Sequence, residues 1–306
     1  MITPGDPLGI GPEVTAKALA ELAEEGLPVD ATVVGHPSAR SCLDRLGVDV
    51  PFLPTGEGRE CAEVEALRVA VGWCQDGRAD ALVTGPIHKG RLAARGFPHP
   101  GHTTFLGELC GVERPVMAFV GGAVRVALVT VHVPLAQVPS LLTRQGVAHT
   151  IRTAHRALVE QLRMEAPRLL LCGLNPHAGD DGLMGDEEAR VLEPAALRCQ
   201  QEGIAVVGPV SAEVAFRKAL HGEADMVIAT YHDQGLAPLK ALDALTGAGA
   251  VNWTLGLPII RTSVDHGTAD DIAGRGIADP RSMKAALSLA AALVGNVPPT
   301  QRVGNS

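Results

Sequence analysis

Short apolar runs alternate with longer amphipathic stretches along this chain of 306 residues. Runs of Val, Ile and Leu followed by glycine or proline are typical of buried parallel strands, and the amphipathic stretches between them predict crossover helices. The pattern therefore predicts an α/β fold. The expected strands span 31–35, 80–85, 116–121, 124–131, 168–174, 204–210 and 225–230. The expected helices span 13–24, 61–76, 145–164, 186–202 and 281–294.

Composition narrows the class of protein further. A hydrophobic content of 46% over this length is enough for two domains, each with its own core. A net charge of −8 without a basic run argues against a nucleic-acid partner. The chain shows neither a transmembrane segment nor a signal peptide, so we expect a cytoplasmic protein with no membrane partner. Its six cysteines form no C-x-x-C pair and are expected to be reduced thiols.

Three of the expected strands end close to a histidine, namely His132, His177 and His232. Ligands of open α/β sheets bind outside the carboxyl ends of the strands, and three neutral imidazoles with an open position make a catalytic metal site. Asp233 and the pair at 180–181 are candidates to orient the rings. The alternative is that each histidine makes a local hydrogen bond and that the aspartates serve as helix N-caps or turn residues.

A second group of residues is suited to binding an anion. The segment His102-Thr103-Thr104 precedes a helix-like stretch, and free backbone N–H groups at a helix start favour an anion. The alternative is that Thr103 or Thr104 is a simple N-cap. Lys240 follows the "YHDQ" segment, and Arg261 ends the strand-like run "NWTLGLPIIR" at 252–261. Both cations could bind phosphate or carboxylate there. The alternative for both is a solvated surface charge.

Nucleotide binding has only a weak generic signal. The stretch "GDPLGIGPE" is neither a P-loop, because it lacks G-K-[ST], nor a Rossmann fingerprint, because its glycine spacing differs. The stretch "SVDHGTADDIAGRG" at 263–276 is a second candidate. Its alternative is a polar loop before the last helix.

Several motifs together resemble the 4-hydroxythreonine-4-phosphate dehydrogenase family of vitamin B6 biosynthesis. They cover nearly the whole chain in the family's order: "TPGDPLGIGPE", "VTGPIHKG", "GHTTF", "LNPHAGDDGLMGDEE", "YHDQGLAPLK" and "NWTLGLPIIRTSVDHGTADDIAGRG". The last also resembles the "HGSAPDIAG" adenine-pocket loop of isocitrate and isopropylmalate dehydrogenases. The resemblance implies an isocitrate/isopropylmalate dehydrogenase-like subunit of two α/β/α domains with a cleft between them. It also implies a homodimer whose metal site takes ligands from both subunits.

The resemblance assigns roles to individual positions. It places a nucleotide-side domain at 1–103 plus 253–306 and a metal-binding and dimerisation domain at 104–252. The implied metal ligands are His132, His177 and His232. The implied catalytic residues are these three histidines and Lys240. The implied substrate contacts are His102, Thr103, Lys240, Asn252 and Arg261. The implied cofactor-binding residues are His266, Gly267, Thr268, Ala269 and Asp271.

Two departures from the family pattern accompany these matches. Glu213 stands where the family commonly has aspartate, and its extra methylene is expected to alter the fit of the substrate. The chain also begins almost at the first glycine loop, so the family's opening strand is expected to be nearly absent. The expected reason is a natural start that lies upstream, and the alternative is a shortened edge strand.

The implied reaction is oxidation of the secondary alcohol of 4-phosphohydroxy-L-threonine by NAD or NADP, followed by decarboxylation of the keto product. One divalent metal per site, Zn or else Mg, Co or Mn, would act as a Lewis acid. Related substrates stay open: threonate or erythronate 4-phosphate, or a carboxylated cyclohexadiene cis-diol. Hypotheses of other classes are a zinc hydrolase with three histidine ligands, which binds no nucleotide, and a non-catalytic metabolite-binding protein.

Overall fold

The computed structural model describes residues 1–27, 29–58, 60–99 and 101–295, so residues 296–306 of the expected nucleotide-side domain lie outside the described part. The chain forms two compact units: unit 1 is Met1–Pro115 with Ala248–Ser306, and unit 2 is Val116–Gly247. These boundaries differ from those expected after residues 103 and 252. Helix α5 (His102–Leu109) packs on α3 (Ala62–Gln75), and strand β10 (Val251–Leu255) pairs with β11 (Ile260–Val264), which keeps both in unit 1.

Unit 1 contains a mixed sheet with the strand order β3-β2-β1-β4-β11-β10. Its neighbouring strands run parallel except for β10 and β11, which form an antiparallel pair. The short opening strand β1 is central, because it pairs with both β2 and β4. The remaining bounds are β1 (Ile2–Thr3), β2 (Val33–Gly35), β3 (Phe52–Pro54) and β4 (Ala81–Thr84).

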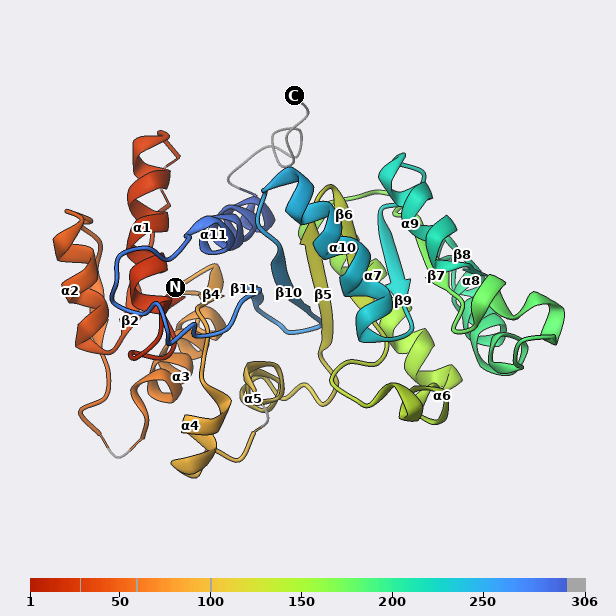
Figure 1. Ribbon diagram of the computed structural model, residues 1–306, viewed down its shortest axis with the longest axis horizontal. Coiled ribbons are helices and arrows are strands. Elements are labelled where there is room, and N and C mark those ends of the chain that lie inside the picture. The colour runs from red at the N-terminus through yellow and green to blue at the C-terminus, as the bar shows by residue number, and fades with distance from the viewer. Residues whose placement is uncertain (28, 59, 100, 296–306) are drawn as a thin grey trace. The chain divides into compact units, whose positions relative to one another are not determined.

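Helices cover both faces of this sheet (Figure 1). Successive strand residues point to opposite faces, so Val33 and Val83 join one apolar cluster while Val34 and Leu82 join the other. The first cluster includes residues of α1 (Gly11–Glu24), α2 (Pro37–Arg45) and α11 (Arg281–Val294). The second includes residues of α3, α4 (Lys89–Ala94) and α5. Unit 1 is therefore an α/β/α layer structure.

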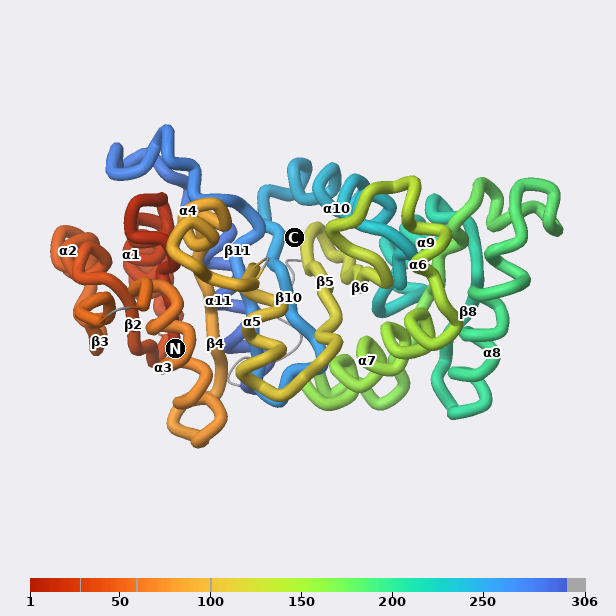
Figure 2. Tube along the Cα trace, turned by 90° about the horizontal axis from the view of Figure 1, so that it is seen from below, coloured from red at the N-terminus to blue at the C-terminus, as the bar shows by residue number. Residues whose placement is uncertain are grey.

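Unit 2 repeats this plan with the strand order β5-β6-β9-β7-β8. Strands β5 and β6 are antiparallel, and the other neighbours are parallel. Helices α7 and α10 lie on opposite sides of β5 and β6 (Figure 2). The strands are β5 (Val116–Gly121), β6 (Val124–Leu128), β7 (Leu169–Cys172), β8 (Val206–Val210) and β9 (Met226–Ala229). The α-helices are α6 (Val138–Leu141), α7 (Arg144–Leu162), α8 (Glu193–Gln201), α9 (Ala212–Leu220) and α10 (His232–Thr246).

The predicted α/β class is confirmed, and two details differ. Both units contain an antiparallel strand pair where parallel strands were expected. The strand-like run 252–261 is a hairpin, because it turns at Gly256, whose φ of 84° suits a residue without a side chain.

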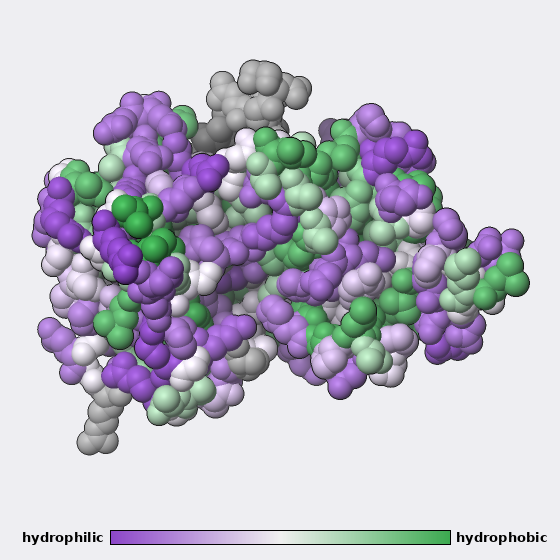
Figure 3. Space-filling view, viewed as in Figure 1, coloured by the Kyte–Doolittle hydropathy of each residue, from purple (hydrophilic) through white to green (hydrophobic). Residues whose placement is uncertain are grey.

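In the part of the chain that the structure describes, no helix is long and apolar enough to span a membrane. On the face in Figure 3, hydrophobic residues form separate patches among hydrophilic ones. All six cysteines are free thiols, as expected.

Candidate active site

A buried guanidinium forms the centre of the polar residues in unit 1. Arg261 lies on β11 between β4 and β10 and is only 2% exposed. Its Nη1 donates to Thr254 Oγ1 at 2.8 Å, and its Nη2 donates to Thr84 Oγ1 at 2.6 Å. Neither threonine was singled out from the sequence, because only the strand order brings residues 84 and 254 to the two sides of residue 261.

His102 completes the immediate surroundings of this cation. It is the first residue of α5, and its Nδ1 lies 3.3 Å from Arg261 Nη2. Desolvation, followed by the charges of Arg261 and Lys89, lowers the pKa of His102 well below its usual value. The ring is therefore neutral at pH 7 and can accept a hydrogen bond. Burial also lowers the pKa of Arg261 to about 9, so Arg261 remains a cation at neutral pH.

Two buried polar atoms near this centre have no hydrogen-bond partner among the described residues, Arg261 Nε and Asn252 Oδ1. Asn252 and Thr254 lie two residues apart on β10 and therefore share a face of the sheet, and Thr254 is the register partner of Arg261. The three hydrogen-bond partners of Arg261 are neutral. A buried cation that lacks a counter-charge is costly, and an anionic ligand would compensate it.

The start of α5 differs from one of the alternatives that the sequence left open. Gly101 is the N-cap residue, so neither Thr103 nor Thr104 caps the helix. Thr104 Oγ1 instead donates to Gly101 O at 3.1 Å. Thr103 follows His102 in the first turn of α5.

The expected cofactor loop is tied to two other segments of unit 1. Ile10 N donates to Thr268 O at 2.9 Å, which joins the first glycine loop to it. Arg91 on α4 donates to Asp270 at 2.6 Å and to the buried Asp6 at 2.7 Å. The hydrogen bond from Arg91, assisted by one from Thr268, lowers the pKa of Asp270 to about 2, so Asp270 is ionised at neutral pH and paired with Arg91.

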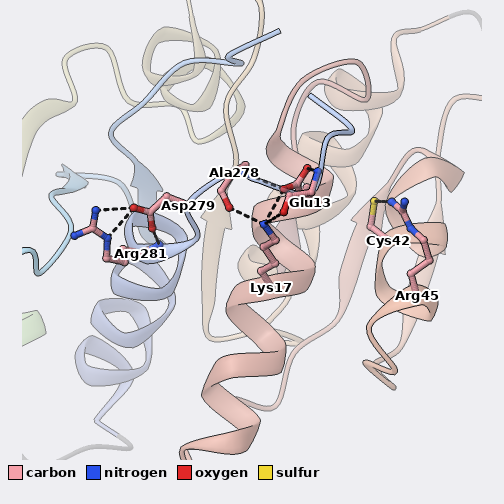
Figure 4. Close-up of polar contacts among 8 residues, drawn as sticks. Glu13, Lys17, Cys42, Arg45, Ala278, Asp279 and Arg281 are labelled. Carbon is pink, nitrogen blue, oxygen red and sulfur yellow. Dashed lines mark hydrogen bonds and ion pairs between the residues drawn. The ribbon is translucent and has the colours of Figure 1, made fainter. Parts of the chain in front are cut away.

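The far end of the same loop is held by the first turns of α1 (Figure 4). Glu13 accepts hydrogen bonds from Ala278 N at 2.8 Å and Gly276 N at 3.2 Å. Lys17 donates to Glu13 at 2.8 Å and also to Ala278 O at 2.8 Å. The glycine-rich stretch that matched no generic nucleotide motif thus positions the loop at 263–278.

Within the loop, His266 offers an unsatisfied group. Its Nδ1 contacts Gly267 O at 2.9 Å, and its Nε2 is buried without a hydrogen-bond partner among the described residues. Gly267 and Asp271 are exposed, Thr268 is buried, and Ala269 has a left-handed backbone with φ 42°. An unpaired buried ring nitrogen beside exposed backbone fits a polar ligand such as a nucleotide.

Two of the three expected metal ligands lie together in unit 2. The ring centroids of His132 and His232 are 5.6 Å apart. His232 is the first residue of α10, and its Nδ1 contacts Asp233 Oδ1 at 2.7 Å. Asp233 therefore orients the ring and is not the N-cap, which is Tyr231. With Nδ1 engaged in this contact, Nε2 of His232 is the nitrogen that could bind a metal, and imidazoles suit Zn or a similar divalent ion.

His177 is not gathered with this pair into a metal-binding group. Within the described ranges, no three or more His, Cys, Asp or Glu side chains are arranged to hold a metal ion. His177 begins a turn at 177–181 in which every residue has a positive φ. The aspartates at 180–181 are residues of this turn.

The other two predicted positions of unit 2 are Lys240 and Glu213. Lys240 lies eight residues beyond His232 on α10, which corresponds to about 12 Å along the helix. Desolvation lowers the pKa of Lys240, and the charge of Asp243 opposes this shift. Glu213 lies in the first turn of α9 and accepts a hydrogen bond from Ser211 Oγ at 3.1 Å.

Comparison with known proteins identifies the family. The model of the pyridoxal phosphate biosynthetic protein PdxA matches residues 21–290. The 4-hydroxythreonine-4-phosphate dehydrogenase of Geobacter metallireducens is 42% identical over 95% of this chain and 94% of that protein. The enzyme of the same name from Aromatoleum aromaticum is 42% identical over 96% of each chain.

Solved structures give the same result. A 4-hydroxythreonine-4-phosphate dehydrogenase from Klebsiella pneumoniae is 34% identical with a TM-score of 0.84, covering 96% of this chain and 97% of that one. A terephthalate 1,2-cis-dihydrodiol dehydrogenase from Burkholderia xenovorans is 26% identical with a TM-score of 0.67, covering 94% and 96%. An isocitrate dehydrogenase from Methylococcus capsulatus, 16% identical with a TM-score of 0.51 over 96% and 85% of the two chains, shares the fold alone. The chain therefore belongs to the PdxA family of pyridoxal phosphate biosynthetic proteins.

Proposed function

We propose that this chain oxidises the secondary alcohol of 4-phosphohydroxy-L-threonine with NAD or NADP, and that the keto acid formed then loses carbon dioxide. The step belongs to the biosynthesis of pyridoxal 5'-phosphate. Family membership and the names of the relatives support the reaction. The structural observation that carries it is the buried Arg261 cation, whose hydrogen-bond partners are all neutral.

The anionic substrate accounts for the polar residues of unit 1. Arg261 would bind phosphate or carboxylate through its unpaired Nε, and Asn252 would contribute its amide. His102 is held neutral, so it can exchange a hydrogen bond with the substrate without adding charge. Thr103 follows it on α5 as a further donor. Lys240 of unit 2 stays a proposed substrate contact, and partial burial lowers its pKa.

The metal-binding role is assigned to the histidines of unit 2. His132 and His232 are close enough to act together, and His177 is proposed as the third ligand. A divalent ion held by them would supply a Lewis acid for the alcohol and for the carbonyl that replaces it. Asp233 orients His232 through its Nδ1 and thereby keeps Nε2 available.

The loop at 266–271 is proposed to bind the dinucleotide, which accepts the hydride. Its attachment to Ile10, Arg91 and Glu13 supports this role, because a rigid loop loses little entropy when a ligand binds. Asp270 places a fixed negative charge there.

We also propose a homodimer in the cytoplasm whose metal site is shared, as the family resemblance implies. The proximity of His132 and His232 indicates that one subunit supplies both. Mixing His177→Ala with His232→Ala protein should then restore one of the two sites in each mixed dimer. Because about half of the dimers are mixed after full exchange, the mixture should show about a quarter of wild-type activity. Mixing His132→Ala with His232→Ala should restore nothing. Absence of recovery in the first mixture, with subunit exchange confirmed by mass spectrometry, would place all ligands in one chain.

The substrate is tested by dinucleotide reduction assays. Purified protein is supplied with NAD⁺ or NADP⁺ and with 4-phosphohydroxy-L-threonine, threonate 4-phosphate or an aromatic cis-dihydrodiol carboxylate. We expect the phosphorylated hydroxythreonine to be oxidised fastest. Oxidation of the cyclic diol alone, the reaction class named for the Burkholderia xenovorans structure, would contradict the substrate but keep the dehydrogenase. Hydrolysis without dinucleotide binding would instead support a zinc hydrolase.

A further inference from the structure

The turn that carries His177 has an unusual backbone. Five consecutive residues, 177–181, have φ values of 53°, 54°, 87°, 45° and 53°. Only Gly179 among them lacks a side chain, and L-residues adopt left-handed conformations singly rather than in runs. Such a run persists only where surrounding contacts determine it. The structure therefore needs a group that holds this turn.

Glu188 supplies these contacts. The residue is buried, at 4% exposure. It is the first residue of the π-helical turn Glu188–Leu192. One carboxylate oxygen, Oε1, accepts from Leu174 N at 2.7 Å and from Asn175 N at 2.8 Å. The other, Oε2, accepts from Asn175 Nδ2 at 2.9 Å. The carboxylate thus satisfies the backbone between the end of β7 and the residue before the turn.

The turn also wraps closely around this carboxylate. A methyl group on Gly179 would come within 2.9 Å of Glu188 Oε2. A methyl group on Gly173 would come within 2.7 Å of Ala178 Cα and 3.2 Å of Glu188 Oε1. The end of β7, the turn and the carboxylate therefore lie too close together for a methyl group at Gly173 or Gly179, so the position of Glu188 is coupled to that of the turn.

A second contact fixes the same strand end. Gln234 Nε2 donates to Gly173 O at 2.6 Å, while its Oε1 accepts from Thr230 N at 2.7 Å. Gln234 follows His232 by two residues, so the segment that holds one expected ligand braces the base of the turn that holds another.

We propose that Glu188 is a positioning residue that holds the left-handed turn in the conformation in which His177 binds the metal. The inference rests on the proposed function, because it takes His177 as a ligand. Glu188 acts through the turn and does not itself bind the ion, since both of its oxygens accept hydrogen bonds from the protein and its side chain is buried.

The test is metal affinity measured without turnover. Protein stripped of metal is titrated with Co²⁺ and Zn²⁺ against a competing chelator, and the Co²⁺ absorption spectrum reports the ligand field. We expect Glu188→Ala to weaken binding by about 10–100-fold and to change the Co²⁺ spectrum. Glu202→Ala is the matched control: Glu202 lies in the same unit and forms an exposed pair with Arg152, so its loss should leave affinity and spectrum unchanged.

A second variant guards against misfolding. Glu188→Asp keeps the charge but withdraws it by one methylene, and we expect about 10-fold weaker binding. Wild-type affinity in folded Glu188→Ala, or in Glu188→Asp if the alanine variant does not fold, would overturn the positioning role. His177→Ala separates this failure from that of the proposed function: if it also binds metal like wild type, His177 is not a ligand and the metal assignment fails.

Discussion

The two polar regions differ in how far the polypeptide alone organises them. In unit 1, Arg261 contacts side chains on β4, β10 and α5 at 2.6, 2.8 and 3.3 Å. In unit 2, His132 lies on the connection after β6, His232 is the first residue of α10, and His177 lies on a left-handed turn outside the pair. Side chains on strands have well-defined directions, whereas residues in turns depend on contacts made elsewhere.

This contrast teaches that the proposed anion-binding group around Arg261 is preformed, whereas the proposed metal ligands depend on supporting contacts. The buried cation is already desolvated before a substrate arrives, so binding need not desolvate it again. The histidines of unit 2 instead depend on neighbouring carboxylates. Asp233 orients the ring of His232, and Glu188 contacts the residues before the turn of His177.

The largest effect of a substitution is expected in unit 2, at the proposed metal ligand His177. His177→Ala should lower metal affinity by more than about 100-fold, because loss of a direct ligand exceeds the 10–100-fold loss typical of supporting residues. Dinucleotide reduction should fall in parallel, while thermal unfolding of the metal-free protein stays unchanged. Metal content by emission spectrometry is the measurement, and His221→Ala, an exposed histidine at the end of α9, is the control. Full activity of His177→Ala in excess chelator would refute the metal mechanism.

The preformed region should respond differently. Arg261→Met should reduce kcat/KM by roughly 10- to 150-fold, equivalent to about 1.5–3 kcal/mol for a lost charge-assisted contact. Metal content should not change, and stability should be kept or increased, because the substitution removes a buried charge without a counter-ion.

Arg45→Met, which removes an exposed arginine of α2 that contacts Cys42, is the control for this substitution (Figure 4). A fall in stability with unchanged kcat/KM would show that Arg261 serves the fold and not the substrate. Lys240→Ala belongs to the same series, and its loss of kcat/KM should be smaller because Lys240 is exposed.

A smaller effect is expected from the attachment of the cofactor loop. Burial raises the pKa of Glu13, but hydrogen bonds from Lys17, Ala278 N and Gly276 N outweigh it, so the pKa is lowered from 4.5. The ionised group therefore stabilises the fold above about pH 4.5, and this contribution is lost as the pH falls through the folded-state pKa. Glu13→Gln should cost about 1–2 kcal/mol in urea unfolding near pH 7. A cost that persists undiminished near about pH 3 would contradict the ionic origin.

The smallest effect concerns His102. Its folded-state pKa lies below the ordinary 6.5, so the unfolded chain binds the extra proton and stability falls as the pH drops below about 6.5. The slope is at most about 1.4 kcal/mol per pH unit. His102→Asn keeps an acceptor for Arg261 but does not titrate, so it should lose less stability than wild type between about pH 7 and pH 5.5. Equal losses in both proteins would mean that His102 is not held neutral.

The sequence anticipated features that depend on local patterns. Strand β5 and helix α11 have the expected bounds, and the histidines do follow strands. Helices α2 and α10 were not among the expected helices, and each contains a proline, Pro37 in α2 and Pro238 in α10, which disfavours a helix in sequence patterns.

Contacts between distant residues were beyond local reasoning. Thr84 and Thr254 meet Arg261 only through the strand order, and Arg91 lies 179 residues from its partner Asp270. The left-handed turn was also invisible, since His177, Ala178 and the aspartates at 180–181 have no sequence signal for that conformation. The glycine-rich "GDPLGIGPE" was the one available sign of the loop attachment.

The discontinuity of unit 1 dictates an order of events during synthesis. Strand β4 lies between β1 and β11, so this sheet cannot close until residues 260–264 have left the ribosome. The whole of unit 2, residues 116–247, emerges earlier and has every strand of its own sheet. Domains generally fold as units while the chain grows. Unit 2 is thus complete while the first 115 residues still wait for the hairpin that carries Arg261. A truncated chain ending near residue 247 would contain all of unit 2 but only part of unit 1.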